Sequence, residues 1–200
     1  EALLRAEPAI ATGLTLFIAV VLDLLSRPAE GFLALSIGLC AVVSDLVAYI
    51  LKVFVFKPLY TGLGLQTLPL LGRGARPPGA SKCGILSMGP NTEATSYGMP
   101  SGHSAQALAM LSIAFLIAPP DAGIGWHIAI LVLGICAIVI PISRIALGCH
   151  TWQQVVFGGI VGIITGYMCS KIVAAHKTHR LDEGAQLGLE NLGASRGREL

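Results

Sequence analysis

The chain has 200 residues, of which 54% are hydrophobic and 12% are charged, and its mean hydropathy is +0.76. A soluble domain usually carries about 25% charged residues, so this composition excludes an ordinary soluble protein and indicates one domain surrounded mostly by lipid. The net charge of +2 comes without a basic block beside aromatic residues. We therefore expect no nucleic-acid partner.

Five apolar stretches approach the length of about 20 residues that a helix needs to cross a bilayer. Pro119 and Pro120 end the third stretch, and Pro141 marks the end of the fourth. No ten-residue alternating pattern suggests a membrane barrel, so the sequence predicts an all-α polytopic transmembrane bundle. The predicted spans cover residues 9–25, 31–56, 101–118, 124–142 and 151–175.

The predicted membrane-embedded domain covers residues 1–175 and contains one long polar loop, residues 58–100, rich in Gly and Pro. A connection of this length without its own regular pattern is usually functional or disordered. Residues 176–200 are polar, with Gly, Ser and mixed charges, and are expected to form a disordered tail. The sequence begins with Glu1, which leaves open a further N-terminal span.

Five spans place the long loop and the connection before the fifth span on one membrane side, and the tail on the other. Basic residues outside the candidate site gather on the tail side. This asymmetry predicts a cytoplasmic tail, with the loops facing a lumen or the exterior. The residues are Arg27, Lys171, Lys177, Arg180, Arg196 and Arg198.

Two of the five cysteines, Cys83 and Cys149, fall in polar connections on the loop side. They could pair in an oxidising compartment. The spacing of the cysteines shows no disulfide framework, however, and this favours free thiols. Cys40, Cys136 and Cys169 lie in apolar runs, where a thiol behaves as a small hydrophobe.

The segment Tyr97–His103 opens the third predicted span. Free backbone N–H groups and the positive end of the helix dipole at such a helix start bind anions. Ser101 can cap the helix or donate to a phosphate oxygen, and Gly102 lets the backbone approach closely. His103 follows on the first turn, where it can share a proton with a bound group. The alternative is a simple helix cap with an interfacial histidine.

Ser143 and Arg144 end the fourth predicted span, and His150 opens the fifth with Gln154 four residues later on the same face. A side-chain oxygen of Gln154 could accept from one ring nitrogen of His150 and leave the other free to attack. Interfacial anchoring, or a snorkelling arginine, is the alternative.

Arg76 lies in the long loop. Its guanidinium and that of Arg144 are planar bidentate donors suited to phosphate, and with the two histidines they form a metal-free cradle for a phosphoryl group. No carboxylate cluster is available to hold magnesium, and His103, His127 and His150 lack the spacing of a zinc site. No metal or other cofactor is expected. Asp45 lies inside a span, where it is either structural or functional.

Together these segments resemble the signature of the type 2 phosphatidic acid phosphatase superfamily, which reads Lys-x6-Arg-Pro, Pro-Ser-Gly-His and Ser-Arg-x5-His-x3-Asp. The second motif matches Pro100–His103, and the third matches from Ser143 through His150. The resemblance covers about residues 50 to 170, in the same order. It implies a six-span helical membrane phosphatase, of which five spans are visible here.

Two departures from the family pattern affect the expected site. Arg76-Pro77 has no lysine seven residues earlier, so Lys52 is the preferred candidate for that role, then Lys57, then Arg73. Gln154 stands where most of the family has Asp. Dolichyl diphosphate phosphatases look like the branch that tolerates Gln here, and they share the Tyr-Gly-Met-Pro-Ser and His-Thr-Trp segments.

The resemblance implies a role for each matching residue. His150 attacks phosphorus and becomes phosphorylated, Gln154 orients it, and His103 protonates the leaving oxygen and later activates water. The remaining donors stabilise the equatorial oxygens. These phosphate-binding candidates are Arg76, Arg144, Ser101, Gly102 and Lys52 or Lys57.

The implied substrate is a membrane lipid phosphate or a polyprenyl diphosphate similar to dolichyl diphosphate, hydrolysed in the endoplasmic reticulum with the site facing the lumen, or at a cell exterior. Phosphatidic acid or a sphingoid phosphate would need only a different lipid groove. From other classes, an inactive phosphatase-like scaffold or a small channel remain alternatives. The missing lysine spacing and Gln154 support the scaffold. Oligomeric state is left open.

Overall fold

The computed structural model describes residues 28–80, 83 and 97–196. The first predicted span, residues 9–25, lies outside the described residues. The described chain is almost entirely helical, with one short two-stranded hairpin. In chain order its elements are α2 Pro28–Ile50, the π-helix η1 Leu51–Phe56, α3 Lys57–Gly62, β1 Thr67–Leu68, β2 Gly72–Arg73, α4 Gly102–Leu116, α5 Ile124–Ala146 and α6 Trp152–Arg196.

Three helical stretches in the described part of the chain are long and apolar enough to cross a membrane: Gly31–Gly62, Ile124–Ala146 and Trp152–Arg180. α4 is apolar but has only 15 residues, and at 1.5 Å per residue it is shorter than a bilayer core. The many large apolar side chains exposed on α2, α5 and α6 are suited to lipid. The all-α membrane bundle predicted from the sequence is confirmed.

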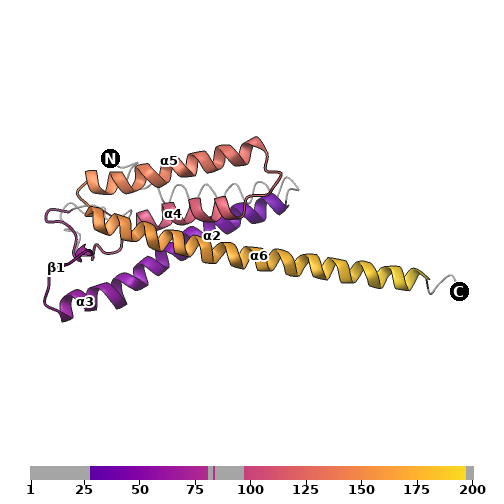
Figure 1. Cartoon of the computed structure of the whole chain (residues 1–200), viewed down its shortest axis with the longest axis horizontal. Coiled ribbons are helices and arrows are strands. Elements are labelled where there is room, and N and C mark those ends of the chain that lie inside the picture. The colour runs from indigo at the N-terminus through magenta and orange to yellow at the C-terminus, as the bar shows by residue number, and fades with distance from the viewer. Residues whose placement is uncertain (1–27, 81–82, 84–96, 197–200) are drawn as a thin grey trace.

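α4 is the central helix, with α5 on one side and α2 and α6 on the other (Figure 1). Its buried face is made of small and apolar residues that pack against α2, and Trp126 and Leu133 of α5 lie against the same cluster. This cluster comprises Ile37, Cys40, Ala41, Ala109, Met110, Ile113 and Ala114. A short helix can occupy the centre of a membrane bundle because neighbouring helices, rather than lipid, cover it.

Glycines on one face of α6 allow the closest contact in the bundle. A Cβ atom on Gly158 would collide with the Ser101 carbonyl, and one on Gly162 would collide with the Ala105 carbonyl. Small residues at such spacing let membrane helices approach backbone to backbone. This contact fixes the N-terminal end of α4 against the beginning of α6.

Several boundaries differ from the sequence prediction. α5 does not end at Pro141 but continues through Ala146 with the proline inside it, as membrane helices tolerate when neighbouring groups satisfy the freed carbonyl. α6 does not end at residue 175 but continues to Arg196, so the expected disorder does not hold for residues 176–196. Extending an existing helix needs no new nucleus, and Leu, Glu, Ala and Gln favour it.

The loop predicted over residues 58–100 also contains regular structure. α3 continues the α2–η1 helix to Gly62, and β1 pairs antiparallel with β2 in the register Thr67↔Arg73 and Leu68↔Gly72. Tyr60 packs in a small cluster with Phe56 and Met99 beneath the hairpin, and its hydroxyl donates to the Gly72 carbonyl at 3.0 Å. The hairpin is thereby held close to the beginning of α6 (Figure 1).

The glycine face of α6 can be tested with two matched substitutions. We expect Gly162→Ala to lower the thermal stability of the purified protein, because its new methyl group meets the Ala105 carbonyl, at a cost of about 1–3 kcal/mol. Gly159→Ala gains the same helix propensity, but its methyl group would lie 3.7 Å from Leu108 Cγ, an ordinary contact. Equal melting temperatures for the two variants in the same detergent would contradict this packing.

Candidate active site

The N-terminal end of α4 lies directly against α6. The Ser101 N–H donates to the Gln154 carbonyl at 3.0 Å, and Ser101 is completely buried as the N-terminal cap residue of α4. The Asp45 carboxylate approaches Gly102 so closely that a Cβ atom there would lie 2.7 Å from its Oδ1. Glycine at position 102 therefore makes room for Asp45 beside the helix start that the sequence assigned to phosphate binding.

A tight turn between α5 and α6 places the histidine of the third motif. Gly148 has a φ of +66°, a left-handed conformation that glycine adopts without strain. The Arg144 carbonyl then accepts hydrogen bonds from the Cys149 and His150 N–H groups at 3.0 and 3.2 Å. The five residues between Arg144 and His150 thus form the last turn of α5 and a reversal of the chain direction that depends on Gly148.

Thr151 and Gln154 form a capping box at the start of α6. The Thr151 N–H donates to Gln154 Oε1 at 3.1 Å, and the Gln154 N–H donates to Thr151 Oγ1 at 3.4 Å. Such a reciprocal pair satisfies two N–H groups that a helix start leaves without partners. The capping box that begins α6 therefore also fixes the position of the Gln154 side chain.

The Gln154 amide makes three further hydrogen bonds, although its residue is completely buried. Its Nε2 donates to the Arg73 carbonyl at 2.7 Å and to the Ala75 carbonyl at 2.8 Å. Its Oε1 lies 3.1 Å from Nδ1 of His150. Because both amide protons are used by carbonyl oxygens, Oε1 must face the imidazole and accept from it.

This network assigns the tautomer of His150, which is 3% exposed. Nδ1 carries the proton and donates to Gln154, which leaves a lone pair on Nε2. Nε2 lies 3.2 Å from Nη1 of Arg76, a guanidinium nitrogen that can only donate. The unprotonated ring nitrogen is therefore directed at the cationic part of the site.

The cationic side chains of this region act on Arg76 and His150. Arg144 is completely buried in the last turn of α5. The pKa of Arg76 is lowered to about 10, mainly because Arg76 itself is buried and then because the charge of Arg144 is near. Burial lowers the pKa of His150 well below its ordinary value, and the charges of Arg76 and Lys52 lower it further. The imidazole is therefore neutral at neutral pH, and an anion bound here would relieve the repulsion among the cations.

The structure separates the three candidates for the family lysine. Lys52 lies in η1, where its charge acts on Arg76 and on His150. Lys57 is exposed in α3, and no interaction of its ammonium with these groups is present in the described part of the chain. Arg73 contributes its backbone carbonyl to the site, and its side chain lines a neighbouring pocket.

Of the other predicted residues, His103 lies in the first turn of α4, where its charge also acts on His150. The structure thus gathers His150, Gln154, Arg76, Arg144, Lys52, Ser101, Gly102 and His103, and leaves Lys57 outside. No group of three or more His, Cys, Asp or Glu side chains is placed to hold a metal ion within the ranges that the structure describes.

Cys83 and Cys149 form a disulfide, with their Cα atoms 5.6 Å apart. The sequence interpretation that favoured free thiols is therefore wrong, because sequence spacing says nothing about which distant segments the fold brings together. The disulfide joins the long loop to the residue immediately before His150. Arg76 Nη1 donates to the carbonyl of the same Cys149 at 3.2 Å.

Residues 33–177 match the PAP2 superfamily. The chain belongs to this family. The match covers α2 through most of α6 and includes every residue of the cluster around His150. No solved structure matches the chain.

Membership in the PAP2 superfamily, together with the long apolar helices, identifies the chain as an integral membrane protein and a phosphate ester hydrolase. Sequence reasoning did not identify the Arg73 and Ala75 carbonyls, because backbone acceptors leave no residue-type signal. It also missed Thr151, although Thr-x-x-Gln before an apolar run is a capping-box pattern.

Gln154 both orients His150 and holds the hairpin through the Arg73 and Ala75 carbonyls, so an isosteric substitution should affect activity and the hairpin together. In Gln154→Glu, a carboxylate oxygen would replace Nε2 and face the Arg73 and Ala75 carbonyls, with two buried hydrogen bonds lost at about 1–3 kcal/mol each. We expect reduced phosphatase activity together with faster proteolysis of the residues 66–80 hairpin region. Asp121→Asn, an isosteric exchange of carboxylate and amide at an exposed position in the connection between α4 and α5, is the control.

Loss of activity in Gln154→Glu with unchanged cleavage of the hairpin would contradict a structural role for the two carbonyls. A fully active Gln154→Glu would show that the amide neither holds the loop nor orients His150.

The disulfide predicts sensitivity to reducing agents. Cross-links that close long loops typically contribute 2–5 kcal/mol, so Cys83→Ser should unfold at lower temperature and hydrolyse substrate more slowly, because Cys149 positions its neighbour His150. A phosphine reductant should slow the native protein to the rate of Cys83→Ser, which itself should not respond. Cys136→Ser, in α5, should respond as the native protein does. A native enzyme indifferent to complete reduction would contradict this role.

Proposed function

We propose that this PAP2 protein hydrolyses a lipid phosphate through a covalent phosphohistidine on His150. The arrangement that supports the proposal most directly is the fixed imidazole, with Nδ1 bonded to Gln154 Oε1 at 3.1 Å and Nε2 turned toward Arg76 at 3.2 Å. A nucleophile needs an available lone pair and a partner that holds its orientation. His150 has both, because burial and the nearby cations also keep it neutral.

In the first step, the Nε2 lone pair of His150 forms a bond to phosphorus while the bond from phosphorus to the lipid oxygen breaks. The electrons of that bond go to the leaving oxygen, which takes a proton from the His103 imidazolium. Arg76 would move from His150 to the phosphoryl oxygens, which Arg144 and Lys52 also stabilise. Positioning and charge stabilisation supply most of the catalysis in phosphoryl transfer.

In the second step, water attacks the phosphohistidine and His103, now neutral, takes a proton from it. The nitrogen–phosphorus bond breaks, and its electrons return to Nε2 of His150. Inorganic phosphate leaves, and both histidines recover their starting protonation states. The neutral Gln154 acceptor stabilises an imidazolium less than a carboxylate would, which favours return to the neutral nucleophile.

We propose a polyprenyl diphosphate similar to dolichyl diphosphate as the substrate. The segments Tyr97–Ser101 and His150–Trp152, and Gln154 in place of Asp, support this branch of the family. Phosphatidic acid or a sphingoid phosphate is the alternative within the same chemistry. An inactive scaffold is less well supported, since Gln154 has a specific role in the site and Lys52 supplies the cation missing from the usual spacing.

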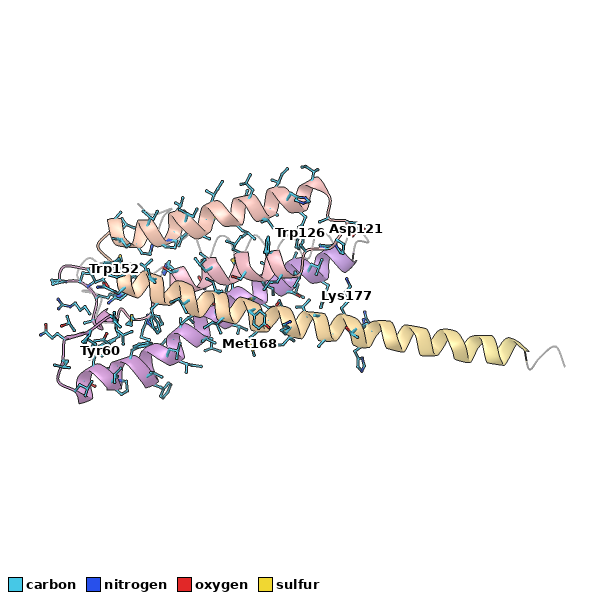
Figure 2. All side chains as sticks on the ribbon, in the orientation of Figure 1. Tyr60, Asp121, Trp126, Trp152, Met168 and Lys177 are labelled. Atoms are coloured by element: carbon cyan, nitrogen blue, oxygen red, sulfur yellow. A yellow bond between two sulfur atoms is a disulfide. The ribbon has the colours of Figure 1, made fainter. Side chains whose placement is uncertain are left out.

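We also propose that the site faces the lumen of the endoplasmic reticulum or a cell exterior. The disulfide between Cys83 and Cys149 supports this orientation, because disulfides persist in oxidising compartments. Tyr60 and Trp152 lie at the hairpin end of the bundle, and Lys177 lies toward the other end with Asp121 and Trp126 (Figure 2). Lys171, Lys177 and Arg180 then belong to the cytoplasmic side.

The proposal is tested with purified protein in detergent, a panel of lipid mono- and diphosphates, and EDTA. We expect phosphate release in the presence of EDTA and an acid-labile, base-stable phosphoprotein after rapid quenching with labelled substrate. His150→Ala should lose both, with turnover reduced at least a thousandfold, because the nucleophile is absent. His127→Ala, an exposed histidine at the start of α5, is the matched control.

Phosphate release without a labelled protein would contradict the covalent route. Retention of activity in His150→Ala would remove that residue from the reaction, and absence of turnover on every lipid phosphate would favour the scaffold.

A further inference from the structure

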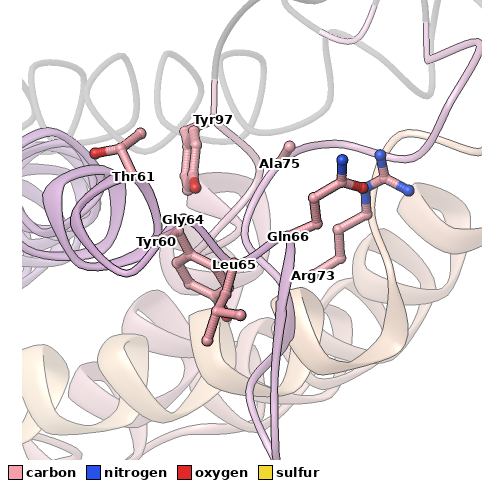
Figure 3. A pocket seen from close by; sticks show the side chains of 8 residues that line it. All are labelled: Tyr60, Thr61, Gly64, Leu65, Gln66, Arg73, Ala75 and Tyr97. Carbon is pink, nitrogen blue, oxygen red and sulfur yellow. The ribbon is translucent and has the colours of Figure 1, made fainter.

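An open pocket of about 320 Å³ lies beside the hairpin. Figure 3 shows the rings of Tyr60 and Tyr97 on one side of it and the side chains of Gln66 and Arg73 on the other. The two tyrosine rings lie 5.9 Å apart and pack against Gly74, where a Cβ atom would lie 2.6 Å from Tyr60. The pocket therefore has a fixed aromatic wall and a polar wall that carries one positive charge.

Arg73 lacks an acceptor for part of its side chain. Its Nε is buried and has no hydrogen-bond partner among the residues that the structure describes. Buried donors are almost always satisfied in folded proteins. This unsatisfied donor belongs to a side chain that lines the pocket, so it points to an acceptor that reaches Arg73 when the side chain shifts toward the pocket. Gln66 adds an amide to the same wall, and an arginine with an amide suits phosphate oxygens.

The pocket adjoins the reacting centre through a few residues of backbone. The Arg73 and Ala75 carbonyls accept from Gln154 Nε2, and Ala75 also lines the pocket. The next residue, Arg76, lies 3.2 Å from His150 Nε2. The three residues from Arg73 to Arg76 span about 10 Å of extended chain at most.

We propose that Arg73 and Gln66 form a second anion subsite that holds the lipid-linked phosphate of a diphosphate substrate while its terminal phosphate lies between His150 and Arg76. This inference rests on the proposed function and makes Arg73 a specificity-determining residue. The Arg73 backbone supports Gln154, and its side chain is left for the substrate. The aromatic wall would face the first carbons of the lipid.

The subsite acts on the leaving group. When Nε2 of His150 bonds to the terminal phosphorus, the bond from that phosphorus to the bridging oxygen breaks, and the electron pair goes to the lipid monophosphate. Arg73 would stabilise the charge that develops there, so less proton donation from His103 is needed. A lipid monophosphate has no second phosphate to place in this subsite, so Arg73 does not speed its hydrolysis.

The test compares kcat/KM for a polyprenyl diphosphate and the matching polyprenyl monophosphate, using the full chain in detergent. We expect Arg73→Gln to lower the value for the diphosphate by about tenfold to a hundredfold, the effect of a charged hydrogen bond, and to change the monophosphate by less than about twofold. Gln66→Glu, an isosteric change at an exposed position, should likewise weaken only the diphosphate. Lys177→Gln, far along α6, is the control.

Competition with methylenediphosphonate, which cannot be hydrolysed, provides a readout besides turnover. The native protein should bind it more tightly than inorganic phosphate, and Arg73→Gln should lose this preference. Equal losses on both lipid substrates, or no loss on either, would overturn the subsite. Those outcomes differ from failure of the proposed function, in which the native protein would hydrolyse neither lipid or His150→Ala would remain active.

Discussion

The side-chain amide of Gln154 joins the parts of the site that come from different regions of the chain. Its oxygen accepts from the Thr151 backbone and from His150, and its nitrogen donates to the Arg73 and Ala75 carbonyls. A buried amide that uses all its donors and acceptors has one orientation. The position of the hairpin, the start of α6 and the tautomer of His150 are therefore set by the same group.

Close backbone contact between α4 and α6 brings Gln154 next to the site residues at the start of α4. Gly158 and Gly162 let α6 approach α4 until the Ser101 N–H reaches the Gln154 carbonyl at 3.0 Å. The motif at the start of α4 and the motif at the start of α6 therefore meet, although about 50 residues separate them in sequence. A bulkier α6 face would separate the two motifs even if each motif kept its own residues.

The sequence predicted the helical bundle because long apolar runs in lipid have few alternatives, and it predicted the clustered residues because their types suit phosphate. It could not place the ends of α5 and α6. The membrane context overrides the helix-breaking signal of Pro141, and the polar residues after Ala175 continue a helix that has already formed. It also could not pair Cys83 with Cys149. That pairing, like the loop carbonyls on Gln154, depends on three-dimensional proximity alone.

The neutral amide at position 154 also fits the charges around it. A carboxylate there would offset the charges of Lys52, Arg76 and Arg144 and would favour a protonated His150, whereas an amide leaves the full positive potential for a bound phosphate. A carboxylate has no proton for the Arg73 and Ala75 carbonyls, so it could not hold this hairpin. The departure from the family pattern at Gln154 and the hairpin between Lys52 and Arg76 are therefore physically linked, because the hairpin backbone supplies carbonyl acceptors that an amide can satisfy and a carboxylate cannot.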